Sequence, residues 1–395
     1  MAQSIRGYGA TAGARLRPVP DPASRPERWD QRRRLWWLLW LRCPGIGPVR
    51  LRALEARLGG LERAWSAAPQ AFEGLAGWPA GLVSDLERFR ARMGEDPLAR
   101  LSRDLRGGRG VLLPGDPPWP AALEMLDRCP PALWWRGKGS LWRPLGRRAA
   151  IAVVGTRRPS SHGLAMAHRL GVGLARAGWP VVSGLAEGID AEVHRGVLAA
   201  GGAPVAVLGT PLERVYPRHH HQLQQQVARC GLLISEQAPG SAVLAGHFAS
   251  RNRLLVALAR AVVVVECPVS SGALHSAELA WRQELPLWVV PADAARLSAV
   301  GSNRLLARGA TPLLEPGDLI SQLGHGPMAE LGESPVPRPL PSRQAALLAA
   351  VGGGASLEQL SLVLGEAPTQ LATQLLELEI AGHLRAEAGL CWRPA

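Results

Sequence analysis

The residues best suited to chemistry lie in short loops of small residues, two of which carry arginine. One loop reads Val154-Gly155-Thr156-Arg157 after a β-branched run, and another, Phe248 to Arg253, opens a helical stretch. Backbone N–H groups at a helix start hold anions, and a guanidinium adds a two-pronged phosphate contact. An aromatic ring beside them can stack on a base. The pattern predicts phosphate binding by Gly155, Thr156, Arg157, Arg251, Asn252 and Arg253, with Phe248 against a base. The alternative for the second loop is an exposed basic helix start with Phe248 in the core.

Two further loops repeat the pattern without arginine. Ser183 and Gly184 follow the next β-branched run, and Ser271 and Gly272 follow a later one. The carboxyl ends of parallel strands share one edge of a sheet, where open α/β sheets bind ligands. Four such loops on one edge therefore predict a groove for an extended polyphosphate.

Two groups of titratable residues could be catalytic or bind a metal, but their spacing favours neither role. Asp190 and His194 would share a helix face, but no nucleophile accompanies them, so Asp190 is expected to cap the helix and orient His194. His219, His220 and His221 are adjacent, and neighbours in sequence rarely converge on one ion, so a solvated loop is expected. We predict no catalytic residue, no metal site and no cofactor.

A glycine hairpin near the N-terminus offers an auxiliary phosphate contact. Gly45 and Gly47 lie between two helical patterns, where they allow a tight turn and expose amides at the next helix start. Arg50 adds a charge. These three residues predict a helix-hairpin-helix that contacts the DNA backbone without reading sequence. The alternative is a hairpin kept only for packing.

A mainly parallel sheet must position the four loops. Between about 110 and 320, short β-branched runs alternate with helical stretches, as in strands buried on both faces and joined by crossover helices. The predicted strands are Ile151–Val154, Pro180–Val182, Val205–Leu208, Leu232–Ile234, Val262–Val265 and Leu287–Val290. The fold class is therefore α/β, with a central Rossmann-like sheet.

The regions on either side of this core differ in composition. Apolar residues spaced three and four apart predict helices before it, and a Pro/Gly-rich connector precedes three helical segments that fit a winged helix. The expected divisions are a flexible basic tail (1–30), a helical helix-hairpin-helix or SAM-like domain (31–106), the core (107–323), a linker (324–341) and a winged-helix domain (342–395).

Composition narrows the class of partner. The 395 residues include 45 Lys+Arg and 32 Asp+Glu, and the net charge of +13 suits a polyanion such as nucleic acid. The alternative is an arginine-rich composition without binding significance. No apolar run reaches the roughly 20 residues that cross a bilayer, so no membrane association is expected. Five scattered cysteines without a C-x-x-C pair suit a reducing cytoplasm.

The ordered motifs of the core resemble the DNA-processing protein A family, also called DprA or Smf. Over 151–310 the chain carries V-G-T-R-x-P-S-x-x-G, S-G-L-A-x-G-I-D, Y-P, S-E-x-x-P-G, F-x-x-R-N-R, S-S-G-x-L and G-S-N-x-L-L-x-x-G-A. The resemblance implies a recombination mediator with no enzymatic activity, which protects incoming single-stranded DNA, displaces single-strand-binding protein and helps load the RecA recombinase in natural transformation. It also implies a homodimer.

The chain departs from the family pattern at several positions. Glu187 stands where arginine is usual and His220 where asparagine is common, and the loop after Gly272 is also atypical. Glu187 removes a positive charge from the predicted edge. The competing hypothesis is a nucleotide-processing enzyme of the nucleoside-monophosphate glycosidase type, because the first loop is similar, although the paired glycines of such enzymes are absent at 270–278.

The C-terminal region is predicted to contact protein rather than DNA. Residues 331–395 contain four arginines and six glutamates, and one helix face offers only Gln370, Thr373 and Gln374. Such a surface attracts a DNA groove weakly. A regulatory or protein-contact role follows.

Overall fold

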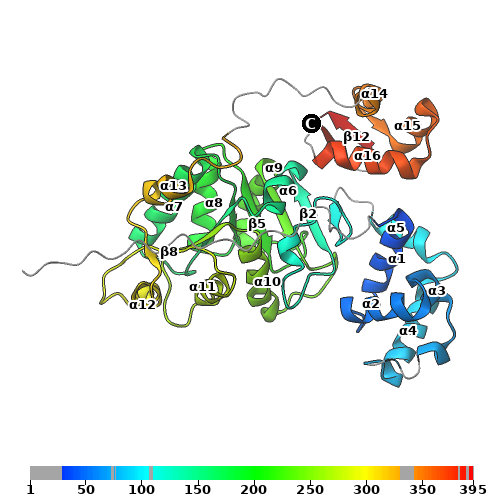
Figure 1. The fold of residues 1–395 in the computed structure, drawn as a ribbon, viewed down its shortest axis with the longest axis horizontal. Coiled ribbons are helices and arrows are strands. Elements are labelled where there is room, and N and C mark those ends of the chain that lie inside the picture. Colours follow the sequence, from blue (N-terminus) through cyan, green and yellow to red (C-terminus); the bar gives the residue numbers. More distant parts are fainter. Residues whose placement is uncertain are drawn as a thin grey trace, which may run out of the picture.

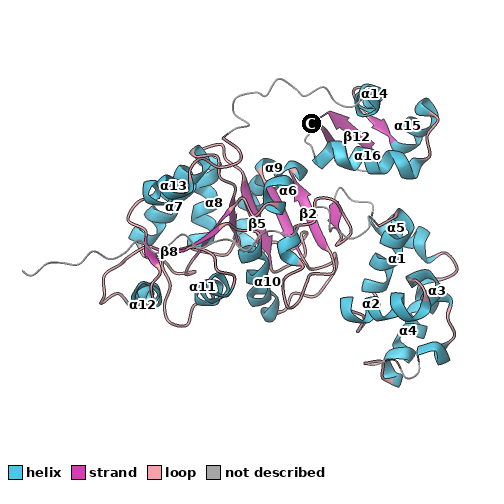
Figure 2. Ribbon diagram, viewed as in Figure 1, coloured by secondary structure: helices cyan, strands magenta, loops and turns pink. Residues whose placement is uncertain are grey.

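A nine-stranded sheet forms the centre of the molecule (Figures 1 and 2). The computed structural model describes residues 29–72, 75, 77–105, 110–329, 342–380, 383–387 and 391–394. The predicted tail (1–30) and the end of the predicted linker lie almost wholly outside these residues. The strands are β1 (Gly110–Leu112), β2 (Leu133–Gly137), β3 (Ile151–Val154), β4 (Val181–Ser183), β5 (Pro204–Leu208), β6 (Leu232–Ser235), β7 (Ala261–Val264), β8 (Leu287–Val289) and β9 (Thr311–Pro312).

The sheet is mainly parallel, as predicted. Its order is β1-β2-β6-β5-β4-β3-β7-β8-β9, and only the pairings of β2 with β1 and β6 are antiparallel. All six predicted strands are present within about a residue at each end, whereas β1, β2 and β9 were not predicted. The chain runs outward from β3 through β6 and then returns to place β7 on the other side of β3. The topological switch point therefore lies between β3 and β7, where open α/β sheets form their ligand crevice.

Helices cover both faces of the sheet. Successive side chains of each strand point to opposite faces, so both faces are apolar and each is buried under helices. Ile151 and Val153 pack with α7, α8 and α13, whereas Ala152 and Val154 pack with α10, α11 and α12. Figure 1 shows these two helical layers on opposite sides of the sheet. The helices of the core are α6 (Trp142–Gly146), α7 (Ser161–Arg176), α8 (Ile189–Ala199), α9 (His221–Cys230), α10 (Ala245–Ala257), α11 (Gly272–Arg282), α12 (Val300–Ala307) and α13 (Pro316–Leu323), with the short 3₁₀ turns η3 (Ala121–Leu123), η4 (Gly139–Leu141), η5 (Arg218–His220) and η6 (Leu297–Ala299).

Among the residues that the structure describes, five α-helices precede the core and pack against it. Asp30 caps the first of them by accepting from the Arg33 N–H at 2.6 Å. The Trp37 indole donates to the Pro131 carbonyl at 2.8 Å, and Arg34 pairs with Asp116, so these helices are tied to the segment between β1 and β2. They are α1 (Gln31–Leu41), α2 (Pro48–Leu58), α3 (Leu61–Ser66), α4 (Ala80–Met93) and α5 (Pro97–Leu105), with η2 (Pro69–Phe72).

The C-terminal region has a small apolar core of its own. Leu347, Leu360, Leu375 and Trp392 are buried together within it. Ser356 and Gln359 form a reciprocal capping box at the start of its second helix. Its elements are α14 (Ser342–Val351), β10 (Ala355–Ser356), α15 (Leu357–Leu364), α16 (Pro368–Ile380), β11 (Leu384–Glu387) and β12 (Cys391–Pro394), and its sheet order is β10-β12-β11.

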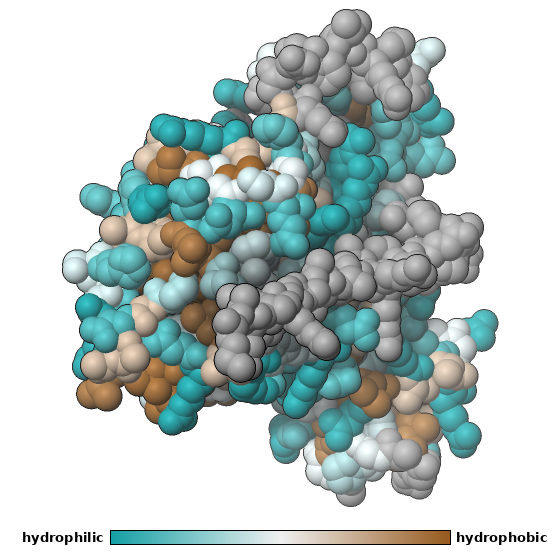
Figure 3. Space-filling view, turned by 60° about the vertical axis from the view of Figure 1, so that its left-hand side comes forward, coloured by the Kyte–Doolittle hydropathy of each residue, from teal (hydrophilic) through white to brown (hydrophobic). Residues whose placement is uncertain are grey.

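The surface mixes polar and apolar side chains. Figure 3 shows one face on which hydrophilic residues predominate, with smaller hydrophobic patches between them. No helix in the part of the chain that the structure describes is long and apolar enough to span a membrane.

Candidate nucleic-acid interface

The structure brings Arg157 and Phe248 together at the carboxyl edge of the sheet. Arg157 is exposed in the loop after β3, and its guanidinium carbon lies 5.9 Å from the centre of the Phe248 ring. The Phe248 ring lies 4.8 Å from that of Tyr216, at an interplanar angle of 49°. A Cβ on Gly209 would approach Phe248 to 2.8 Å, so this glycine lets the ring pack on the end of β5. We call Phe248 and Tyr216 the aromatic platform.

A cavity of about 490 Å³ opens beside the platform and was not predicted. Three arginines line it, from the loops after β3 and β5, together with the Tyr216 ring. Tyr216 is 46% exposed, so the platform presents part of an aromatic face to solvent. The sequence signal was the Y-P motif, to which no role was assigned. The lining residues are Arg157, Ala186, Glu187, Thr210, Arg214, Val215, Tyr216, Pro217, Arg218 and Val243, and we call this space the Tyr216 cavity.

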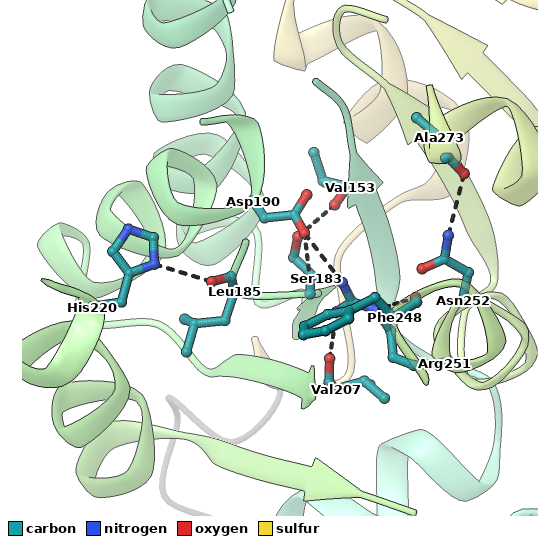
Figure 4. Close-up of polar contacts among 12 residues, drawn as sticks. Val153, Ser183, Leu185, Asp190, Val207, His220, Phe248, Arg251, Asn252 and Ala273 are labelled. Atoms are coloured by element: carbon teal, nitrogen blue, oxygen red, sulfur yellow. Dashed lines mark hydrogen bonds and ion pairs between the residues drawn. The ribbon is translucent and has the colours of Figure 1, made fainter. Parts of the chain in front are cut away.

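Arg251 is buried and does not face solvent at the carboxyl edge of the sheet, so the predicted phosphate contact by this residue is wrong. Only 7% of the residue is exposed, and its Nη1 donates to the Val207 carbonyl at 2.5 Å. Its Nη2 lies 3.9 Å from the Asp190 carboxylate (Figure 4). Burial lowers the pKa of Arg251, while the Asp190 charge raises it. A Cβ on Gly184 would overlap the Arg251 guanidinium, so Gly184 serves this internal packing rather than a ligand.

Arg253 is likewise held by a carboxylate. Its Nη2 donates to both oxygens of Glu236 at 2.7 Å, and its side chain is only 12% exposed. The neighbouring Asn252 donates to the Gly272 carbonyl at 3.2 Å and thereby joins α10 to α11. Of the three predicted cations, Arg157 alone is exposed at the edge, so the predicted cluster of guanidiniums is wrong.

The predicted anion seat after β3 is filled by the protein itself. The Glu266 carboxylate, which follows β7, accepts from the Ser160 N–H at 3.1 Å, the Ser160 hydroxyl at 2.7 Å and the Ser298 hydroxyl at 2.5 Å. Ser160 is the N-cap of α7, so an internal carboxylate occupies the helix start at the switch point. This arrangement disfavours the alternative of a nucleotide-processing enzyme with a phosphate at that position.

The small residues of the predicted loops make internal contacts, including those of the loop after β3. Thr156 is buried and donates its N–H to the Glu266 carbonyl at 2.7 Å, and Gly155 packs against Ile189. The buried Ser183 hydroxyl donates to the Val153 carbonyl at 2.7 Å. Ser271 caps α11 by accepting from the Ala273 N–H at 3.2 Å. Gly272 is exposed, but its carbonyl accepts from Asn252, so a direct phosphate contact is not evident for these residues.

Asp190 does not orient His194. The N-cap of α8 is Gly188, and the Asp190 carboxylate accepts from the Gly184 N–H at 3.1 Å. Within the described residues neither ring nitrogen of His194 has a hydrogen-bond partner. Burial, reinforced by the charges of Arg251 and His220, lowers the pKa of His194 to about 3. His194 is therefore a neutral core residue rather than a catalytic one.

A pH-dependent stability follows from His194. Its pKa is about 3 in the folded chain and 6.5 when unperturbed, so between these values the unfolded chain binds the extra proton. Stability should consequently fall as pH drops from 6.5 towards 3. Replacing His194 with leucine should reduce this slope, measured as the urea midpoint at pH 7 and pH 5. An unchanged slope would show that other groups cause the acid sensitivity.

The three adjacent histidines point in different directions. His219 Nε2 lies 3.4 Å from the Glu187 carboxylate, whereas His220 is buried and its Nδ1 lies 3.1 Å from the Leu185 carbonyl. His221 is exposed on α9. The expected solvated loop is thus correct for His219 and His221 and wrong for His220. No cluster of three metal-binding side chains occurs among the described residues.

The N-terminal hairpin folds its arginine back on itself. Gly45 has φ +75°, and Gly47 is the N-cap of α2. Arg50 donates to the Gly45 carbonyl and, through Nε, to the Gly77 carbonyl at 2.8 Å. Arg50 therefore stabilises the turn through its contacts with the Gly45 and Gly77 carbonyls. These contacts favour the alternative, a hairpin kept for packing, over a DNA-backbone contact by Arg50.

Comparison with known proteins identifies the family of this chain. Residues 110–324 match the model of the family "DNA recombination-mediator protein A". The Protein Smf of Synechocystis is 34% identical over 298 residues, covering 75% of this chain and 74% of that protein. The crystal structure of DNA processing protein A from Streptococcus pneumoniae is similar with a TM-score of 0.61 and 26% identity, covering 73% of this chain and 97% of that one. The structure of a Helicobacter pylori DNA processing protein A, described as having a unique single-stranded DNA binding mode, has a TM-score of 0.49 and 30% identity over 54% of this chain and 95% of that one.

Proposed function

Because the chain belongs to the DNA recombination-mediator protein A family, we propose that its aromatic platform and Arg157 bind single-stranded DNA. The observation that carries this proposal is the exposed guanidinium of Arg157 beside the rings of Phe248 and Tyr216. Arginine binds a phosphate while an aromatic ring stacks on the adjacent base. The family's role as recombination mediators requires such a strand.

The platform favours a single strand over a duplex for a physical reason. A duplex hides the faces of its bases in its own stack, whereas an unpaired strand leaves them free to stack on protein rings. Phosphate contacts release counterions, so binding should weaken as salt rises. Anisotropy titrations with a labelled 20-mer, single-stranded and duplex, test the proposal. Equal affinity for the two would overturn it.

Further parts of the proposed function concern partners. The DNA-bound chain is proposed to receive strands covered by single-strand-binding protein and to help load RecA as a cytoplasmic homodimer. We assign no chemical step to it. Residues 31–106 are proposed to form the helix-hairpin-helix or SAM-like domain, 107–323 the core and 342–395 a winged helix.

The C-terminal region is proposed to contribute little to DNA affinity. It contains few cations, and it buries its own apolar core, so its removal should leave the central sheet intact. Deletion of 342–395 should change single-strand affinity by less than about threefold, because few phosphate contacts would be lost. A loss of tenfold or more in the same anisotropy assay would contradict this prediction.

A further inference from the structure

The Tyr216 cavity combines cations and an aromatic ring with one carboxylate. Arg157, Arg214 and Arg218 surround it, and Glu187 lines the same space. Its volume of about 490 Å³ lies within the roughly 300–1,000 Å³ typical of small-molecule sites. A cavity of this size accepts one nucleotide unit of a strand.

The walls of the cavity are held by internal hydrogen bonds. The Thr210 hydroxyl donates to the Arg214 carbonyl at 2.9 Å, and Ser235 donates to the Thr210 carbonyl at 2.7 Å. The Gly240 N–H donates to Glu213 at 2.6 Å and links the loop after β5 to the loop after β6. Because these loops are fixed by such contacts, the space is shaped before a ligand arrives.

Glu187 is unexpected in a site for a polyanion. Its side chain is 48% exposed, and its ion pair within the described residues is with His219 at 3.4 Å rather than with a cavity arginine. A carboxylate repels phosphate, but it accepts hydrogen bonds from the exocyclic amino groups of bases. Cytosine, adenine and guanine carry such a group, and thymine does not.

We propose that the Tyr216 cavity takes a single base of the bound strand and that Glu187 selects bases that carry an exocyclic amine. The base stacks on Tyr216, its phosphate lies among the arginines, and Glu187 accepts from the amine. The inference rests on the proposed single-strand binding and adds a base preference to it. Thymine places its carbonyl oxygen against the Glu187 carboxylate, which repels it.

The test compares oligo-dC with oligo-dT on the full chain. Labelled 20-mers are titrated by anisotropy at pH 8 and fixed salt, and oligo-dC should bind about fivefold more tightly, a modest fraction of a full base contact. Glu187→Gln should reduce this preference to less than twofold, mainly by strengthening oligo-dT binding, because the repelling charge is removed. Glu358→Gln makes the same charge change on an exposed position of α15 and should leave the preference unchanged.

Two outcomes separate this inference from the proposed function. Equal binding of both oligomers by the wild-type chain, or a preference that Glu187→Gln leaves unchanged, overturns the role of Glu187 while single-strand binding stands. A wild-type chain that binds neither oligomer overturns the proposed function and the base preference with it.

Discussion

Replacing Arg157 with alanine and Phe248 with leucine is expected to weaken single-strand binding by about 100-fold while the chain stays folded. A stacked base contributes roughly 1–3 kcal/mol and a charge-assisted phosphate contact roughly 1.5–3 kcal/mol, and about 1.4 kcal/mol corresponds to a factor of ten. Arg157 is exposed, so its loss costs little packing. Leucine keeps an apolar side chain against Gly209 but removes the aromatic face. Anisotropy titration and a thermal melt measure the two effects.

The matched control is Arg260→Ala. Arg260 is also exposed, but it lies just before β7, at the opposite edge of the sheet from Arg157. Its removal lowers the net charge equally and should change affinity by less than about threefold, because general electrostatic attraction falls only slightly. If Arg260→Ala weakens binding as much as the double replacement, net charge rather than the platform determines affinity.

Replacing Arg251 with alanine is expected to destabilise the fold by about 3–5 kcal/mol, the usual cost of removing one partner of a buried ion pair. The substitution leaves the Val207 carbonyl and the buried Asp190 carboxylate without their guanidinium. Urea unfolding of the full chain measures the loss. Arg157→Ala should change the free energy of unfolding by less than about 0.5 kcal/mol, as usual for an exposed residue.

A second substitution tests the cause of that loss. Asp190→Asn in the Arg251→Ala chain removes the unpaired charge, and the asparagine carbonyl can still accept from the Gly184 N–H. Stability should be partly restored. A double variant as unstable as the single one would place the cost in the Val207 contact instead. Weaker DNA binding without a loss of stability in Arg251→Ala would show that Arg251 contacts the strand after all.

The central sheet could be predicted because its signal is local. Most of the predicted parallel strands are short apolar runs rich in β-branched residues, and all four residues of Ile151–Val154 are buried. β2 was not predicted because its sequence, Leu133-Trp134-Trp135-Arg136, is aromatic and contains no β-branched residue. β1 and β9 have only three and two residues, too short to show a period.

The site was predicted only in part. Carboxylates distant in sequence pair with some of the arginines, and these pairs determine which guanidiniums remain exposed to a ligand. Arg157 and Arg251 look alike in sequence, but Arg251 meets Asp190 from 61 positions earlier, and Arg253 meets Glu236. An acid after a strand gives no sign that it will fill a helix start, so the role of Glu266 was missed. The residues of the Tyr216 cavity come from four loops, those after β3, β4, β5 and β6, and nothing in the local sequence indicates that these loops converge.

The carboxylate of Glu266 has a consequence for the small molecules that the central sheet can bind. Many scaffolds of this topology bind a phosphate-bearing compound at the switch point, against the start of a helix. In this chain the Glu266 carboxylate occupies the corresponding position, where it accepts hydrogen bonds from Ser160 and Ser298. We therefore expect ATP or NAD added at millimolar concentration to leave the thermal melting temperature of the chain unaltered, because the internal carboxylate already occupies this helix start.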